Sequence, residues 1–157
     1  MCGIAGLIHK GKTVNIGKEL QDMLQALKHR GPDASGIYVK KNLGLGHRRL
    51  SIIDTREVSN QPMHSNSKIW HLVFNGEIYG FEKIKQEYKD YPFKTNSDTE
   101  LLLAMYLKHG EKMLDYLPGM FSFAIWDNRN QKLFCARDRF GEKPFFYSIL
   151  NSDRILQ

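Results

Sequence analysis

The chain has 157 residues, 41% of them hydrophobic, which is enough for one sizeable core and too little for two domains of ordinary size. Its formal net charge of +6 comes from basic residues interleaved with acids along the chain, a pattern typical of a solvated surface, so we expect no nucleic-acid partner. No run of about 18 apolar residues and no secretory start are present, so we expect a cytoplasmic chain without a membrane partner.

The two cysteines, Cys2 and Cys135, are expected to be free thiols, because nothing else in the sequence indicates secretion. The sequence contains no CxxC, no HxxxH and no carboxylate cluster at ligand spacing. We therefore predict no metal site.

The first predicted element is a buried strand, Gly3–Ile8, made of small, apolar and β-branched residues. Apolar residues at helical spacing then predict an amphipathic helix over residues 18–29, ended by Gly31 and Pro32. β-branched and aromatic segments between turn residues predict further strands. These strands cover residues 36–40, 44–53 and 69–74.

Two helices are predicted next, over residues 81–88 and 98–108, and Ser97 resembles an N-cap with Glu100 three residues on. The last third predicts a hairpin and one more strand, over residues 120–126, 132–136 and 144–149. Because these elements follow no βαβ rhythm, we expect an α+β fold of two antiparallel sheets with helices on their outer faces.

Cys2 is the most informative position for function. Removal of Met1, which is normal before a small residue, would give Cys2 a free α-amine. An α-amine has a reference pKa of about 7.7 to 8.0 and a cysteine thiol about 8.5, so the amine could accept the thiol proton without a histidine. Taken alone, however, Cys2 is more simply a small apolar residue of a buried strand.

Six further segments accompany Cys2 and together span nearly the whole chain. They are Arg30-Gly31-Pro32-Asp33-Ala34-Ser35-Gly36, His47-Arg48-Arg49-Leu50-Ser51-Ile52-Ile53-Asp54, Asn60-Gln61-Pro62-Met63, Phe74-Asn75-Gly76-Glu77-Ile78-Tyr79, Ser97-Asp98-Thr99-Glu100 and Arg137-Asp138-Arg139-Phe140-Gly141-Glu142-Lys143-Pro144. In content, order and spacing they resemble the class II glutamine amidotransferase domain, most closely the glutaminase half of glutamine-hydrolysing asparagine synthetase. One departure is Gly80, where the family usually has asparagine, and it concerns only the local loop geometry.

The resemblance implies an N-terminal-nucleophile hydrolase fold, a four-layer αββα sandwich of two antiparallel sheets flanked by helices, over residues 1–157. It also implies that Cys2 attacks the side-chain amide of L-glutamine and releases ammonia through a γ-glutamyl thioester. The oxyanion would be stabilised by the side chain of Asn75 and the backbone N–H of Gly76.

The same resemblance assigns the groups that bind glutamine. Arg49 would pair with the α-carboxylate, for which its planar fork is suited, and Asp98 with Glu77 would pair with the α-ammonium. Backbone groups of Leu50, Ser51, Ile52 and Ile53 would lie along the ligand. Arg30 and Asp33 would support the site loop and could pair with one another.

Simpler interpretations remain open for several of these residues. Asn75-Gly76 is also a good turn pair, and Asp98 could be a first-turn helix acid. Arg48 should face away from Arg49 into solvent. Cys135 is expected to be an inert core thiol.

A Cys-His pair with His47 is the rival mechanism, although the resemblance requires no histidine.

In the family, the ammonia passes to an ATP-dependent synthetase domain on the carboxyl-terminal side, and ATP and Mg belong to that domain alone. No phosphate-binding Ser-Gly-Gly-type loop occurs up to Gln157, so we expect one glutaminase domain that needs no cofactor, without its synthetase domain. Formation of a homodimer is also possible from the sequence. The alternatives are an amidotransferase for another acceptor, such as a sugar acid, and a non-catalytic glutamine-binding or interaction domain, which retention of Met1 would favour.

Overall fold

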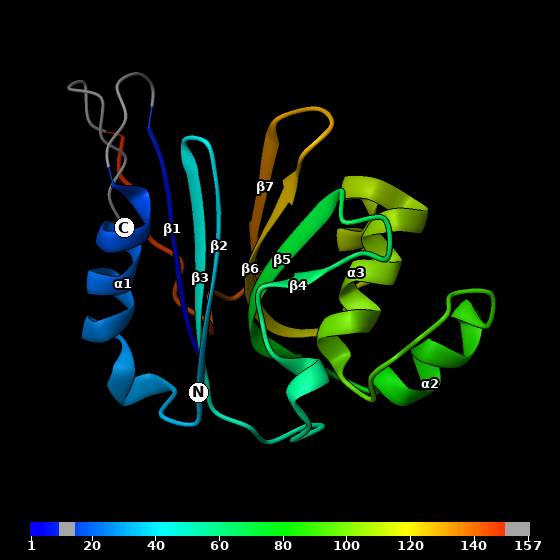
Figure 1. The fold of residues 1–157 in the computed structure, drawn as a ribbon. Coiled ribbons are helices and arrows are strands. Elements are labelled where there is room, and N and C mark those ends of the chain that lie inside the picture. The colour runs from blue at the N-terminus through cyan, green and yellow to red at the C-terminus, as the bar shows by residue number, and fades with distance from the viewer. Residues whose placement is uncertain (10–14, 150–157) are drawn as a thin grey trace.

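Two antiparallel sheets lie face to face between helices in the computed structural model, which describes residues 1–9 and 15–149 (Figure 1). The strands are β1 (Gly3–Ile8), β2 (Ala34–Lys40), β3 (Leu43–Arg49), β4 (Met63–His64), β5 (Trp70–Ile78), β6 (Gly119–Asp127) and β7 (Lys132–Arg137). The α-helices are α1 (Ile16–Ala26), α2 (Phe81–Lys85) and α3 (Asp98–His109). Short 3₁₀ helices are η1 (Lys28–Arg30), η2 (Glu57–Ser59), η3 (Gln86–Tyr88) and η4 (Gly110–Asp115).

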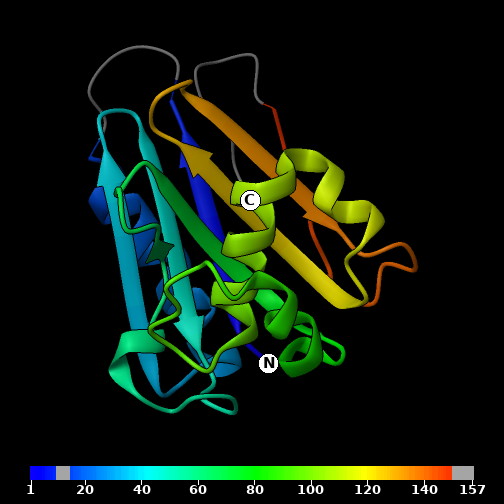
Figure 2. The same ribbon diagram turned by 90° about the vertical axis from the view of Figure 1, so that its right-hand side faces the viewer.

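The layers follow the order helix, sheet, sheet, helix. The described strands pair as β1-β3-β2 in one sheet and as β4-β5-β6-β7 in the other, with every pairing antiparallel. Helix α1 covers the outer face of the first sheet, and α3 covers that of the second (Figures 1 and 2). This arrangement confirms the predicted αββα sandwich.

Alternation along the strands separates three apolar layers, because successive side chains of a strand point to opposite faces. The clusters are Leu7, Ile16, Leu20 and Leu24 under α1; Leu43, Leu45, Val73, Ala124 and Trp126 between the sheets; and Leu72, Phe74, Leu101, Leu102, Met105 and Phe123 among those under α3. The alternation decides which polar residues of β1, β3 and β5 face the other sheet.

Two strand ends differ from the prediction. Strand β3 ends at Arg49, so residues 50–53 leave the sheet, whereas we expected the strand to continue through Ile53. Strand β5 continues through Ile78, because Gly76 pairs with Phe121 of β6. Asn75 and Gly76 therefore lie inside a strand and form no turn.

The helix starts are set by side-chain caps. Asn15 accepts a hydrogen bond from the Lys18 N–H at 3.1 Å, so α1 begins earlier than the predicted residue 18, and it ends at Ala26 before η1. Ser97 caps α3 by accepting from the Thr99 N–H at 3.0 Å, as predicted. Predicted helix 81–88 is divided between α2 and η3.

Residues 144–149 form no strand, contrary to the prediction, and they carry large exposed side chains. Phe146 is 78% exposed, Tyr147 76% and Ile149 70%. Cys135 on β7 is also exposed, so it is not the core thiol that we expected. In the described ranges, no helix has the length and apolar character needed to cross a membrane.

Candidate active site

Three of the predicted site residues, Cys2, Arg49 and Asn75, lie at one end of the layer between the sheets. Leu43 and Leu45 of β3 face the second sheet, so alternation also directs His47 and Arg49 inward. Asn75 follows Val73 on β5 in the same way. The layer therefore changes from apolar to polar along its length.

The thiol of Cys2 is held against the backbone of one residue, Leu50. The Leu50 N–H donates to Cys2 Sγ at 3.5 Å, and the thiol lies 3.8 Å from the Leu50 carbonyl oxygen. Arg30 Nε donates to the Cys2 carbonyl at 3.1 Å. These contacts fix both the backbone and the sulfur at the start of β1.

Met1 contacts a buried cation in this structure. Lys143 is only 6% exposed, and its Nζ lies 2.9 Å from Met1 Sδ. A thioether is a weak acceptor, so this contact compensates little for the burial of an ammonium group. Removal of Met1 would take this contact away from the Lys143 ammonium.

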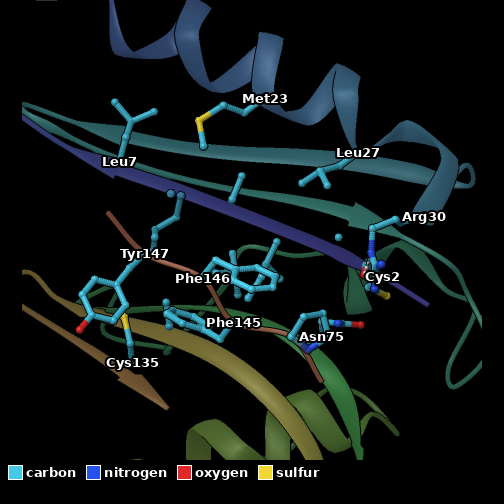
Figure 3. A pocket seen from close by; sticks show the side chains of 18 of the residues that line it. Cys2, Leu7, Met23, Leu27, Arg30, Asn75, Cys135, Phe145, Phe146 and Tyr147 are labelled. Atoms are coloured by element: carbon cyan, nitrogen blue, oxygen red, sulfur yellow. Dashed lines mark hydrogen bonds between the residues drawn. The ribbon is translucent and has the colours of Figure 1, made fainter. Parts of the chain in front are cut away.

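A cavity of about 530 Å³ runs along β1 from Cys2 toward β7. Figure 3 shows Cys2, Arg30 and Asn75 at one end and Cys135 with Tyr147 at the other. Phe145 lies between the two ends. The side chain of Asn75 thus shares a space with the thiol of Cys2, as the predicted oxyanion role requires.

The Gly76 N–H of β5 points away from β6, as the partners of its neighbours show. Neighbouring N–H groups of a strand alternate in direction, and those of Phe74 and Ile78 point away from β6. They donate to Gln61 Oε1 at 2.6 Å and to Asp98 Oδ2 at 3.1 Å. The Gly76 N–H is directed to the same edge, between these two bonds.

Glycine is required at position 76 by packing as well. A Cβ there would lie 2.3 Å from the Met120 carbonyl oxygen and 2.8 Å from the Phe121 Cα. A larger residue would push β5 away from β6 and displace Asn75.

Arg49 is buried and organises the loop that follows it. Its Nη1 donates to the Arg56 carbonyl at 3.0 Å and to Asn60 Oδ1 at 2.7 Å. Its Nη2 donates to the carbonyls of Ile53 at 3.3 Å and Asp54 at 2.5 Å. These bonds fold the loop back over the guanidinium, so β3 ends at Arg49.

Asp98 is buried at the first turn of α3, where it accepts the Ile78 N–H. Burial, together with the charge of Glu77, raises the pKa of Asp98 to about 6, although hydrogen bonds from the backbone oppose the rise. Glu77 is itself exposed. A cationic group placed beside these two carboxylates would favour the ionised form of Asp98.

The remaining predicted binding residues lie on the loop after Arg49. Leu50 contacts Cys2, and the Ser51 N–H donates to Asp33 Oδ2 at 2.7 Å. The Ile52 side chain is 75% exposed, and the Ile53 carbonyl is held by Arg49.

Arg30 and Asp33 support different parts of the site. Arg30 holds the backbone of Cys2, and Asp33 holds that of Ser51. Among the ion pairs of the described residues, none joins Arg30 to Asp33.

Arg48 faces α1, opposite to Arg49 as expected, but it is half-buried, and its Nε has no hydrogen-bond partner in the described ranges.

His47 is engaged between the sheets. It is 1% exposed, and its ring Nε2 lies 3.2 Å from the Phe74 carbonyl oxygen. Burial is the main reason that its pKa falls to about 4, so the ring is neutral near pH 7. The hydrogen bonds described for the Cys2 sulfur involve Leu50, which gives the rival Cys-His pair no support.

The sequence assigned no role to several residues of the quoted segments, among them Asp54, Gln61 and Lys143. Asp54 and Gln61 fix the site loops, and Lys143 contacts Met1. Their presence in these segments was the only sequence signal that they belong to the site, because the residues they contact are distant in sequence. In the part of the chain described, no group of three His, Cys, Asp or Glu side chains gathers as metal ligands would.

Gly80 has a φ of +64° at the start of α2, and a Cβ added there would meet nothing within 4 Å. Asparagine tolerates this left-handed conformation too, so the departure from the family pattern leaves the loop geometry unchanged.

Known proteins resemble this chain over nearly its whole length. A family model described as a glutamine amidotransferase domain matches residues 1–156. The chain is 40% identical over 156 residues to glutamine-hydrolyzing asparagine synthetase 1 of Bacillus subtilis (strain 168), covering 96% of this chain and 24% of that protein. It is 40% identical over 148 residues to glutamine-hydrolyzing asparagine synthetase B of Escherichia coli (strain K12), covering 93% and 26%. The chain thus spans about a quarter of the length of these relatives.

Among solved structures, glutamine phosphoribosylpyrophosphate amidotransferase from Bacillus subtilis, complexed with ADP and GMP, is similar with a TM-score of 0.80. The similarity covers 98% of this chain and 41% of that one, at 20% sequence identity, and supports the fold. Since the family model covers almost every residue, the chain belongs to the glutamine amidotransferase domain family.

Proposed function

We propose that this chain is the glutaminase domain of a glutamine-hydrolysing asparagine synthetase, with Cys2 as the nucleophile. The observation that carries the proposal is the position of the Cys2 thiol, which shares a cavity with Asn75 and is held by the peptide that follows Arg49. The resemblance to the family and the 40% identity to two such synthetases support it.

Removal of Met1 begins the chemistry by creating the α-amine of Cys2. This amine takes the thiol proton, and the sulfur then attacks the side-chain amide carbon of glutamine. Negative charge develops on the amide oxygen, where the side chain of Asn75 and the N–H of Gly76 stabilise it. The C–N bond breaks as the amine returns the proton, giving ammonia and a thioester.

Water then attacks the thioester carbon while the α-amine accepts its proton. Breaking of the C–S bond releases glutamate, and the proton returns to the sulfur of Cys2. The overall reaction is glutamine plus water to glutamate plus ammonia, so neither a nucleotide nor a metal enters its balance.

Binding of free glutamine requires a partner for each of its two α charges. Asp98 and Glu77 supply negative charge for the ammonium group. Arg49 supplies the cation for the carboxylate, which takes the place of the Ile53 carbonyl, the acceptor at 3.3 Å, while Arg49 keeps its bond to the Asp54 carbonyl. Only the part of the loop at Ile53 therefore adjusts when the substrate enters.

The ammonia is used by a carboxyl-terminal, ATP-dependent synthetase domain. The relatives are about four times as long as this chain, which leaves room for such a domain. The exposed aromatic side chains of Phe140, Phe146 and Tyr147 supply an apolar surface on which it could pack.

The test is to incubate purified, Met1-processed protein with glutamine, with and without ATP and aspartate. We expect glutamate without ATP and no asparagine from this chain alone. Intact mass should show that active molecules lack Met1, and full activity in a population that keeps Met1 would refute the amine-base mechanism. Absence of glutamate, even after the synthetase domain is added, would favour a non-catalytic domain.

A further inference from the structure

The two groups proposed to bind the charges of glutamine belong to different layers of the molecule. Arg49 ends β3 in the first sheet, and Asp98 begins α3 on the outer face of the second sheet. Glutamine can pair with both only if their separation is held constant. A connection between the loop after Arg49 and the loop before Asp98 is therefore needed.

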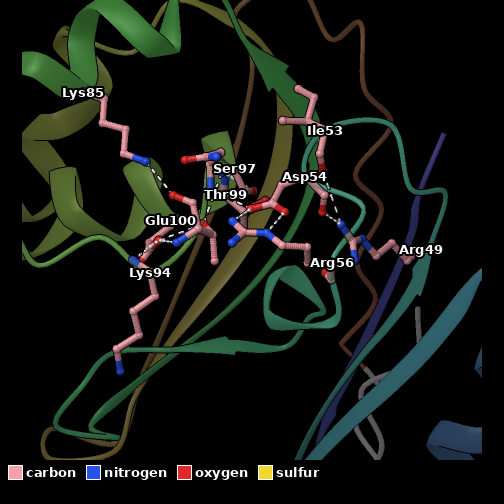
Figure 4. A network of polar contacts seen from close by, with 11 residues as sticks. Arg49, Ile53, Asp54, Arg56, Lys85, Lys94, Ser97, Thr99 and Glu100 are labelled. Carbon is pink, nitrogen blue, oxygen red and sulfur yellow. Dashed lines mark hydrogen bonds and ion pairs between the residues drawn. The ribbon is translucent and has the colours of Figure 1, made fainter.

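Asp54 makes this connection (Figure 4). Its carbonyl oxygen accepts from Arg49 Nη2 at 2.5 Å, and its carboxylate Oδ2 accepts from the Asn96 N–H at 2.6 Å. Asn96 lies two residues before Asp98. One residue thus contacts the guanidinium of Arg49 and the backbone that leads directly into α3.

The Asp54 carboxylate is fixed on several sides. Arg56 Nε and Nη2 donate to its two oxygens, each at 2.6 Å, and only 2% of the Asp54 side chain is exposed. The Arg56 guanidinium foremost keeps the pKa of Asp54 below its usual range, so the carboxylate is ionised near pH 7. Its bond from Asn96 is therefore charge-assisted and stronger than a neutral one.

The loop before Asp98 is held from the other side by Glu100. Glu100 accepts the N–H groups of Lys94 and Thr95, and Lys85 Nζ donates to the Thr95 carbonyl at 2.5 Å. The predicted capping contact between Glu100 and Ser97 is replaced by these bonds. Because Glu100 anchors the loop before Asp98 to α3, the contact between Asp54 and Asn96 determines where the loop after Arg49 lies relative to α3.

We infer that Asp54 is a positioning residue that sets the spacing between Arg49 and Asp98. Through this spacing, it makes the site prefer free glutamine, which carries both α charges, over analogues that lack one of them. This inference rests on the proposed function. It assigns to Asp54 no contact with the reacting atoms. Its loss should weaken glutamine binding more than it slows the chemical step at Cys2 and Asn75.

Two substitutions distinguish the contribution of the Asp54 carboxylate from that of the Asp54 backbone. Asp54 has a φ of +47°, which glycine adopts without strain and asparagine tolerates. Asp54→Gly removes the whole connection to Asn96, whereas Asp54→Asn keeps an acceptor but loses the charge. Glu111→Gln is the matched control, because it removes an exposed ion pair with Lys132 far from these loops.

The experiment measures kcat and KM with the Met1-processed protein for glutamine and for 5-amino-5-oxopentanoate, which lacks the α-amine. Since a displacement of about 1 Å can cost about 10²-fold, we expect Asp54→Gly to raise the KM for glutamine about tenfold or more, with kcat changed less than about threefold. Asp54→Asn should have a smaller effect in the same direction. Preference for glutamine over the analogue should fall in both variants, and Glu111→Gln should match the wild type.

Binding of glutamine to the same proteins in a Cys2→Ala background gives a dissociation constant that does not depend on catalysis. A wild-type protein that binds glutamine without hydrolysing it would refute the proposed function, while weaker binding after Asp54→Gly would still support the inference. An unchanged KM and dissociation constant, or a fall in kcat alone with unchanged selectivity, would overturn it. Failure to bind glutamine at all would refute both.

Discussion

The two ends of the cavity between the sheets carry the same chemical group in opposite surroundings. At one end, the Cys2 sulfur contacts the polar peptide of Leu50 beside Asn75. At the other, Cys135 is partly exposed but lies among Leu133 and aromatic side chains, and partial desolvation by these neighbours raises its pKa to about 11. The comparison teaches that the polar groups around a thiol, rather than its presence in a cavity, determine its role.

The largest effect on activity is expected from a substitution at the polar end of the cavity. Cys2→Ala removes the proposed nucleophile, so we expect glutaminase activity to fall by about 10⁴-fold or more. A glutamine-like diazoketone should label only the amino-terminal peptide of the wild type and no peptide of the variant. Measurable turnover by Cys2→Ala, with labelling elsewhere, would contradict the assignment.

Removal of the neighbouring amide tests whether the polar end stabilises a transition state. Asn75→Ala should lower kcat by about 10² to 10³-fold, because it deletes an oxyanion donor, and should leave the KM for glutamine nearly unchanged. Steady-state kinetics over a range of glutamine concentrations measure both constants. A change confined to KM would show that Asn75 binds the ground state instead.

Much of this polar end could be predicted from alternation. Cys2, Arg49 and Asn75 have the parity of inward-facing neighbours such as Ile4, Leu45 and Val73, once the strands are known to form two facing sheets. The family resemblance supplied their roles, which remain proposals.

What sequence patterns missed depends on distant partners. The end of β3 is set by carbonyls that Arg49 collects from its loop, and β5 passes through Asn75-Gly76 because it pairs with β6. Local propensity favours a turn at Asn-Gly, and tertiary pairing overrides it. The strand expected at residues 144–149 has no pairing among the described strands.

Asp98 allows a sharper test through pH. Its pKa in the folded protein is about 6, above the ordinary 3.8, so the folded state binds more protons than the unfolded state between these values. Stability contributed by this group is therefore present below pH of about 4 and is lost as pH rises through about 6. Ionised Asp98 is needed to bind ammonium, so the KM for glutamine should rise as pH falls below about 6.

Asp98→Asn separates the two effects. It removes a buried charge, so at pH 7.5 the variant should be more stable than the wild type by on the order of 2 kcal/mol, with the gain lost near pH 4. Its KM for glutamine should rise about tenfold or more, because the substrate ammonium loses its partner. Urea unfolding at the two pH values and steady-state kinetics give both results. A variant less stable than the wild type at pH 7.5 would contradict the raised pKa.

The smallest effect is expected at the apolar end. Cys135→Ala removes a thiol that contacts no proposed catalytic group, and with a pKa of about 11 almost none of it is ionised near pH 7. Since the thiolate is the reactive form, iodoacetamide at pH 7.5 should modify Cys2 well before Cys135. The variant should keep kcat/KM for glutamine within about twofold of the wild type, because a partly exposed side chain leaves little cavity when shortened. Peptide mass mapping over a time course measures the modification. Preferential modification of Cys135, or a large loss of activity in Cys135→Ala, would show that the two ends of the cavity are chemically alike.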